Sequence, residues 1–154
     1  MTTTSEKWPD LAGHMVGGGH VLPVRVYFED TDFSGVVYHA NYLKFMERAR
    51  SDMLRLMGSS HEALVDGVLG EPLAFAVHRI EVDFRAPARI DELIEVETRV
   101  GEVGGARLRL DQIVRRGEET LVEAKVTVVM INHQGRARRI PDAVRESLAA
   151  LDRG

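Results

Sequence analysis

The sequence predicts an α+β domain in which a mainly antiparallel sheet curls around one long helix. Apolar residues recur at helical spacing from Tyr42 to Met57, with polar residues at the other positions. Residues 22–29 before this segment, and several segments after it, alternate apolar with polar residues, as half-buried strands do. A single helix with one apolar face needs cover, and a sheet wrapped around it provides that cover.

Length and composition restrict the class of protein. With 154 residues and 17.2 kDa, the chain is large enough for one domain with its own core. It has no cysteine, which excludes disulfides, thiolate nucleophiles and cysteine-ligated zinc. The formal net charge is -4 and the basic residues are scattered between acidic ones, so we expect no nucleic-acid partner. No apolar run approaches the ~20 residues of a membrane span, and the first residues do not resemble a signal peptide. We therefore expect a soluble, cytoplasmic protein without a transmembrane segment.

The chain begins with a segment that we expect to be a flexible arm. Residues 1–20 include the isolated Trp8 and the glycines at 17–19, so we place the single domain at residues 21–154. The first strand is expected at residues 22–29, and the long helix follows an acidic turn. Gly58 suits the left-handed position that ends a helix. A short helical turn is expected at His61 to Val65.

Four further strands follow, which makes five in all. Residues 80–84 and 94–100 alternate and are joined around Pro87, residues 107–116 form the next strand, and a turn at 116–119 leads into a long strand at 121–131. Near the end of this last strand, Val126, Val128 and Met130 should face the helix. Val129 and Ile131 on the other side need cover, which predicts an oligomer. A terminal helix is expected from Pro141 to Leu151.

The most distinctive segment is the acidic turn before the long helix. Asp30, Thr31 and Asp32 are followed by Phe33, Ser34 and Gly35, where a helix presents unpaired main-chain N–H groups. Such a place can bind or polarise an oxygen. In an arbitrary Asp-x-Asp segment, however, the two carboxylates more often only cap a turn.

The wider segment EDTDFSGVVYHANYLKFMERAR, residues 29–50, resembles the signature of the 4-hydroxybenzoyl-CoA thioesterase family, and within it the Tol-Pal-associated acyl-CoA thioesterases. The later FRAPARIDELIEVETRV, residues 84–100, also resembles the family. The resemblance implies a hot-dog fold, with a five-stranded sheet around the helix. It also implies homodimers or homotetramers with active sites between subunits, and an acyl-CoA or acyl carrier protein substrate.

By position, the resemblance gives Asp32 the role of the catalytic carboxylate and Asp30 a supporting one. Asp32 would act as general base on water or attack the thioester directly, and the sequence leaves both routes open. The main-chain N–H of His39, at the start of the helix, corresponds to the oxyanion donor, with the imidazole as a secondary contact. Phe33 and Ser34 depart from the small residues usual in the family, which affects the shape of the acyl pocket.

The other candidate residues are assigned to substrate binding or to the surface. The substrate-binding candidates are Asp30, Phe33, Gly35, Val37, Tyr38 and Asn41. Asn41 is also expected to form a structural hydrogen bond near the helix start. Five arginines could meet the phosphates of CoA or simply be solvated surface: Arg85, Arg89, Arg136, Arg138 and Arg139. The histidines lack metal-ligand spacing, so we expect neither a metal nor another cofactor.

Two other functions stay open at this point. The same fold could belong to a non-catalytic acyl-CoA binding or scaffold protein, or to a dehydratase. Release of free thiol from acyl-CoA would separate hydrolysis from both. The sequence does not specify the acyl group.

Overall fold

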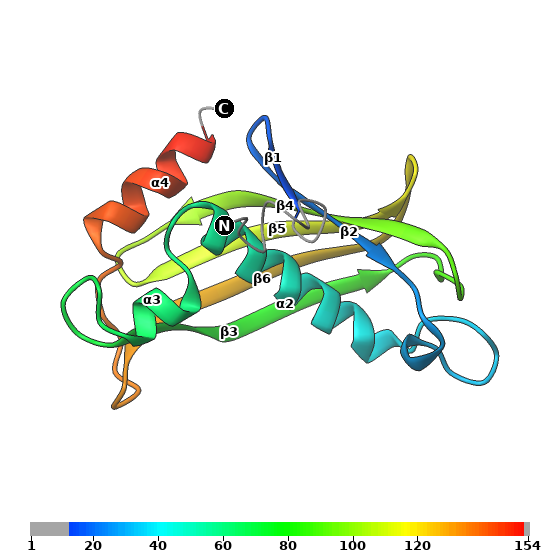
Figure 1. The fold of residues 1–154 in the computed structure, drawn as a ribbon, viewed down its shortest axis with the longest axis horizontal. Helices are drawn as coiled ribbons and strands as arrows, with labels where there is room; N and C mark the ends of the chain where they lie inside the picture. The colour runs from blue at the N-terminus through cyan, green and yellow to red at the C-terminus, as the bar shows by residue number, and fades with distance from the viewer. Residues whose placement is uncertain (1–12, 153–154) are drawn as a thin grey trace, which may run out of the picture.

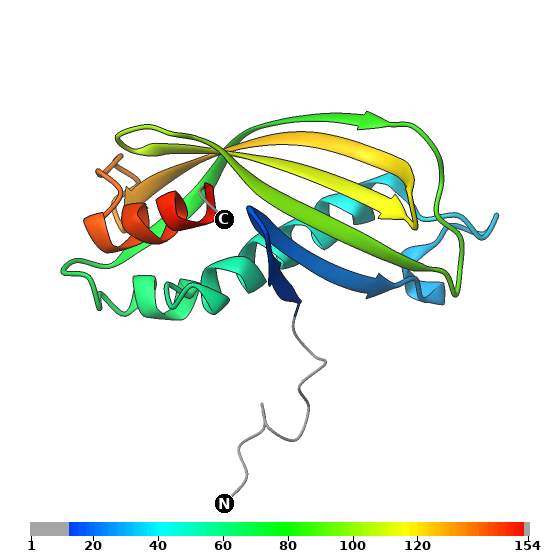
Figure 2. The ribbon, with the colours of Figure 1, turned by 90° about the horizontal axis from the view of Figure 1, so that it is seen from above.

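The computed structural model describes residues 13–152, in which a curved antiparallel sheet arches over one long helix (Figures 1 and 2). In chain order the elements are β1 (His14–Val16), β2 (Gly19–Arg25), the 3-10 helix η2 (Phe28–Asp30), α2 (His39–Leu56), α3 (His61–Val65), β3 (Leu73–Phe84), β4 (Leu93–Val103), β5 (Arg107–Arg116), β6 (Glu119–Asn132) and α4 (Asp142–Asp152). The six strands lie in the order β1-β2-β4-β5-β6-β3. The fold class predicted from the sequence is confirmed.

The expected count of five strands is one too few, because part of the expected arm is folded. β1 pairs antiparallel with the start of β2, and Gly18 between them has a φ of +78°, a value that glycine adopts without strain. Residues 14–16 and 19–20 therefore lie in strands, and the sheet begins before residue 21. Trp8 lies outside the described residues. β2 also ends at Arg25, earlier than expected, because the chain turns into η2.

The apolar face of α2 is confirmed, with two corrections. Tyr42, Phe45, Met46, Ala49 and Met53 are buried, as expected, and Gly58 after the helix has a φ of +83°. Arg50 and Asp52, which the pattern assigns to the polar face, are also buried, whereas Leu56 is 43% exposed. Buried polar groups need hydrogen-bond partners, and both residues find them on other elements.

The later strands form the central and edge parts of the sheet. Val126, Val128 and Met130 of β6 are buried. Val129 and Ile131, which alternate with them, are half-buried. β3 begins at Leu73, earlier than expected. The prediction missed its first residues because they are uniformly apolar and do not alternate with polar residues. Within the described sheet β3 pairs only with β6, so it is an edge strand. No helix within residues 13–152 has the length and hydropathy to cross a membrane.

The two ends of the domain differ. α3 and α4 lie together at the end where α2 finishes, and the acidic turn lies at the opposite end, where α2 begins (Figures 1 and 2). The predicted terminal helix is confirmed as α4, whose Val144 and Leu148 are buried. Within the described chain, the candidate site is built from the loop before α2, the first turn of α2 and the end of β3.

Candidate active site

The acidic turn has a defined backbone. The main-chain N–H of Gly35 donates to the carbonyl of Asp32 at 3.0 Å, and the N–H of Asp32 donates to the carbonyl of Val36 at 2.9 Å. Gly35 has a φ of +83°, which the turn requires and a residue with a side chain would adopt only with strain. A bridge between Thr31 and Val37 closes the base of the turn. These contacts fix the position of Asp32 at the beginning of the turn.

The carboxylate of Asp32 is held in its charged form. One of its oxygens accepts hydrogen bonds from the hydroxyl of Ser34 and from the main-chain N–H of Ser34, the latter at 2.9 Å. The hydroxyl and then the N–H of Ser34 lower the pKa of Asp32 below its ordinary value, because both donors favour the charged carboxylate. The side chain is exposed. An ionised, accessible carboxylate of this kind can accept a proton from water or act as a nucleophile.

Asp30 and Asn41 connect this turn to the helix. The Asp30 carboxylate accepts from the main-chain N–H of Tyr27 at 2.8 Å, and the Asp30 carbonyl accepts from the Asn41 side chain at 2.8 Å. The same carbonyl accepts from the N–H of Tyr38 at 3.0 Å. The structural hydrogen bond expected of Asn41 is thus confirmed. A direct role of Asp30 or Asn41 in substrate binding stays a prediction.

The start of α2 presents main-chain N–H groups that can bind an acceptor. Tyr38 is the N-cap residue, and its side chain makes no capping hydrogen bond. The first N–H groups of a helix have no intrahelical acceptor, so those of His39 and Ala40 depend on other partners. The exposed His39 ring lies 4.7 Å from that of Tyr38 and 5.9 Å from that of Phe84, measured between ring centroids.

A groove of about 260 Å³ lies beside this helix start. It is lined by Val37, His39, Tyr42, Phe84, Arg85, Ala86 and Pro87. Two hydrogen bonds hold its wall: the N–H of Val37 donates to the carbonyl of Ala88 at 2.9 Å, and the N–H of Ala88 donates to the hydroxyl of Tyr42 at 2.9 Å. Burial raises the pKa of Tyr42, so this hydroxyl stays neutral. The groove is therefore a built surface between α2 and the end of β3.

The structure brings only some of the predicted residues into this groove. Val37 and His39 line it, whereas Asp32 and Phe33 do not, and the Phe33 side chain is fully exposed. Sequence reasoning missed Phe84, Ala86 and Pro87 as wall residues. One indication of their importance is present in the sequence: they lie at the start of residues 84–100, the second segment that resembles the family. Asp32 and Phe33 are both exposed in the single chain.

The five arginines considered for CoA binding do not form one cluster. Arg85 and Arg89 lie near the groove, and Arg85 forms an ion pair with Glu123 at 2.7 Å. Arg136, Arg138 and Arg139 follow β6 at the opposite end, where Arg138 pairs with Glu71 at 2.9 Å. Within residues 13–152, no group of three or more His, Asp or Glu is arranged to hold a metal ion.

A curved antiparallel sheet around one long helix, with a carboxylate turn at the helix start, defines a hot-dog fold of the thioesterase class. Residues 34–123 match the model of the Thioesterase superfamily. This chain belongs to that superfamily.

Individual relatives agree with this assignment. The acyl-CoA thioester hydrolase YbgC of Escherichia coli O157:H7 is 45% identical over 111 residues, which are 71% of this chain and 80% of the relative. The acyl-CoA thioesterase YbgC of Haemophilus influenzae is 42% identical over 118 residues, covering 77% and 85%. The crystal structure of a probable thioesterase from Bartonella henselae is 48% identical, with a TM-score of 0.78 over 80% of this chain and 99% of that chain.

Proposed function

We propose that this protein hydrolyses acyl-CoA thioesters, with Asp32 as the catalytic carboxylate and the main-chain N–H of His39 as a donor to the oxyanion. The observation that carries the proposal is the ionised Asp32 on a fixed turn just before an uncapped helix. The substrate class follows from the relatives, whose names specify acyl-CoA thioester hydrolysis.

The reaction needs only groups that are present at this site. Asp32 accepts a proton from a water molecule as the water oxygen attacks the thioester carbonyl carbon. The negative charge that develops on the carbonyl oxygen is stabilised by the N–H of His39 and by the positive end of the α2 dipole. The carbon–sulfur bond then breaks, and the thiolate takes up the proton to give free CoA and the acid. Direct attack by Asp32, through a mixed anhydride that water then cleaves, uses the same groups and stays open.

A second copy of the chain completes the site in this proposal. β3 is an edge strand on which Val77 and Phe84 are each 50% exposed, and an exposed edge of this kind is a ready pairing surface. If two copies pair their β3 strands antiparallel around a two-fold axis, the end of β3 in one copy lies beside the start of β3 in the other. The acidic turn of each copy then approaches the far end of the other's α2.

Binding of an acyl carrier protein and a location in the cytoplasm are also parts of the proposal. An acyl carrier protein presents a thioester to the site just as CoA does, so the chemistry described above does not separate the two carriers. Cytoplasmic location fits the use of CoA and the absence of cysteine from the sequence.

The test is release of free thiol from a panel of benzoyl, short-chain and long-chain acyl-CoAs. Wild-type protein should release thiol from at least one of them, and Asp32→Asn should lower kcat by roughly 10²–10⁴-fold while acyl-CoA binding persists. Glu29→Gln is the matched control, because Glu29 is an exposed carboxylate of the same segment, and it should retain activity. Binding without thiol release by the wild type would favour the scaffold function instead. Near-normal turnover by Asp32→Asn would show that Asp32 is not the catalytic group.

A further inference from the structure

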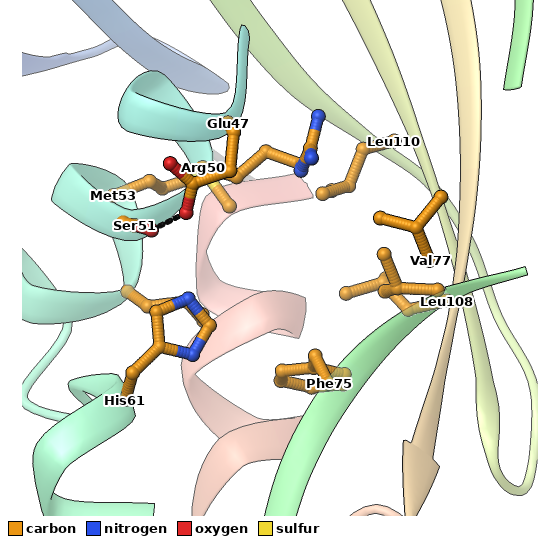
Figure 3. A pocket seen from close by; sticks show the side chains of 11 residues that line it. Glu47, Arg50, Ser51, Met53, His61, Phe75, Val77, Leu108 and Leu110 are labelled. Carbon is orange, nitrogen blue, oxygen red and sulfur yellow. Dashed lines mark hydrogen bonds between the residues drawn. The ribbon is translucent and has the colours of Figure 1, made fainter. Parts of the chain in front are cut away.

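A second cavity lies between the far half of α2 and the sheet (Figure 3). Its volume is about 80 Å³, whereas roughly 10–15 Å³ suffices for one water molecule. The walls are mostly apolar and come from β3, β5 and β6: Phe75, Val77, Leu108, Leu110 and Val128. The cavity therefore has room for a compact apolar group of several non-hydrogen atoms.

One wall of this cavity carries a buried cation. Arg50 of α2 is only 8% exposed, and its guanidinium extends toward Leu110 across the cavity (Figure 3). It donates one hydrogen bond, at 3.0 Å, to the side-chain oxygen of Gln112. The amide nitrogen of Gln112 in turn donates to the Met46 carbonyl at 3.0 Å and to the Thr98 hydroxyl at 2.9 Å. This network fixes the guanidinium but supplies no negative charge.

Arg50 lacks a close counter-ion within the described chain. Residues 13–152 contain no ion pair of Arg50, and burial lowers the pKa of its guanidinium, an effect that the charge of Glu47 opposes. Glu47 itself is exposed at the mouth of the cavity and accepts a hydrogen bond from the Ser51 hydroxyl at 2.7 Å (Figure 3). Water screens an exposed carboxylate, so Glu47 compensates Arg50 only in part. Buried charges in proteins are normally paired with an opposite charge. An anion bound in the cavity would supply that partner for the Arg50 guanidinium.

We propose that this cavity binds the distal end of a compact acyl group that carries a carboxylate, and that Arg50 selects such substrates. The inference rests on the proposed thioesterase function and specifies its substrate class: short dicarboxylic acyl thioesters. The apolar walls contact the methylene groups, and the Arg50 guanidinium receives the terminal carboxylate.

The geometry assigns the cavity to the helix start of a second copy. Arg50 lies eleven residues after His39, so it is displaced by roughly 16 Å along the helix axis. A compact acyl group does not span that distance. Antiparallel pairing of two β3 strands would instead place the cavity of one copy, near Phe75 and Val77, beside the acidic turn of the other. Asp32 of one copy would then hydrolyse an acyl group held by Arg50 of the other.

The first test compares two substrates with equal numbers of acyl carbons, glutaryl-CoA and valeryl-CoA. Wild-type protein should have the higher kcat/KM with glutaryl-CoA. Arg50→Met should lower the glutaryl-to-valeryl ratio by roughly 10–100-fold, the range typical of a hydrogen bond to a charged group. Arg50→Lys should lower it less, because lysine keeps the charge but loses the planar donor geometry. Arg48→Met is the matched control, since Arg48 is exposed on the same helix, and it should leave the ratio unchanged.

The second test determines whether Asp32 and Arg50 of one site come from the same chain or from two chains. A mixed dimer, purified through two different tags, would combine one Asp32→Asn chain with one Arg50→Met chain. With glutaryl-CoA it should recover about half of the wild-type activity, because one of its two equivalent sites then has both Asp32 and Arg50 intact. If each site belongs to a single chain, neither chain has both groups, and activity with glutaryl-CoA stays at or below the low level of the Arg50→Met protein.

The outcomes separate this inference from the proposed function. Thiol release from valeryl-CoA or benzoyl-CoA, without a preference for glutaryl-CoA, would overturn the carboxylate specificity and leave the thioesterase proposal standing. An equal loss with both substrates in Arg50→Met would show that Arg50 only holds α2 to β5 through Gln112. If Arg50→Met does not fold, the ratio in Arg50→Lys decides the question. No thiol release from any acyl-CoA would contradict the proposed function itself.

Discussion

The imidazole Nε2 of His20 lies 2.6 Å from an oxygen of Asp52, in a buried contact that joins β2 to α2. The same carboxylate oxygen accepts from the main-chain N–H of Gly13 at 2.8 Å, and the other oxygen pairs with Arg55. Because Asp52 accepts, Nε2 carries the proton. The other ring nitrogen of His20 is buried without a partner in the described chain. Asp52 therefore anchors both the β1–β2 hairpin and Gly13, which precedes it.

We predict that Asp52→Ala destabilises the protein by about 2–4 kcal/mol, because it leaves buried donors of His20 and Gly13 unsatisfied. For a chain of this size the melting temperature should fall by roughly 5–15 °C. Thermal unfolding followed by circular dichroism would measure it. Asp66→Ala, at an exposed aspartate, is the control and should change stability by less than ~0.5 kcal/mol. Equal melting temperatures for the two variants would contradict the anchoring role.

This contact is also an example of a feature that the sequence could not predict. The stripe from Tyr42 to Met53 and the strand at Arg107–Arg116 were predicted correctly, because their periodicity is local and strong. The burial of Asp52 depends on His20, 32 residues away, and that of Arg50 on Gln112, 62 residues away. The periodicity of neighbouring residues does not predict contacts between residues so far apart in the sequence.

The short strand β1 was missed for a related reason. His14, Met15 and Val16 are all exposed, so β1 has no buried face and no apolar alternation. The glycines beside it have the composition of a linker, although Gly18 forms the turn of the hairpin. Pairing with β2 alone makes these residues a strand.

A second prediction concerns the pH dependence of hydrolysis. The Ser34 hydroxyl and N–H lower the pKa of Asp32, so removing the hydroxyl should raise that pKa toward its ordinary value. Asp32 acts when ionised, and the acidic limb of the kcat/KM profile should therefore move to higher pH in Ser34→Ala. At neutral pH both proteins keep Asp32 charged, so their rates there should be similar.

The control for this profile is Ser147→Ala, since the Ser147 hydroxyl donates to the Ala143 carbonyl in α4, far from the turn. Its acidic limb should coincide with that of the wild type. An acidic limb that stays in place in Ser34→Ala would mean that a group other than Asp32 sets it.

The candidate site was predicted only in part. The acidic turn and the helix start could be assigned because their residues are contiguous and resemble a family signature. The groove wall at Phe84 and Ala88 meets α2 only through tertiary contacts, including the bond from the Ala88 N–H to Tyr42. Its position follows from the curvature of the sheet, which the strand period does not encode.

A third prediction tests association through the edge strand. Val77→Lys places a charge on the exposed edge of β3 and should raise the dimer dissociation constant at least about tenfold, equivalent to ~1.4 kcal/mol. Sedimentation velocity over a concentration series would measure it. Val68→Lys is the control, because Val68 is 70% exposed but lies after α3, away from this edge. A wild-type monomer with full activity, or equal effects of the two lysines, would exclude pairing through β3.

The last prediction separates the backbone of His39 from its side chain. If the main-chain N–H is the oxyanion donor, His39→Ala keeps it and His39→Pro removes it. His39→Pro should lower kcat by roughly 10²–10³-fold, the usual cost of one lost oxyanion donor, and His39→Ala should lower it much less.

The structure gives a reason to expect that His39→Pro folds. His39 is the first residue of α2, where proline is well tolerated because its missing N–H has no intrahelical acceptor. The preceding Tyr38 has φ -63° and ψ 127°, the extended conformation that a residue before proline prefers. Circular dichroism and thermal unfolding should therefore match those of His39→Ala. If the folded His39→Pro protein hydrolyses its substrate as fast as His39→Ala, the donor is a different group, and the N–H of Ala40 is the next along the helix.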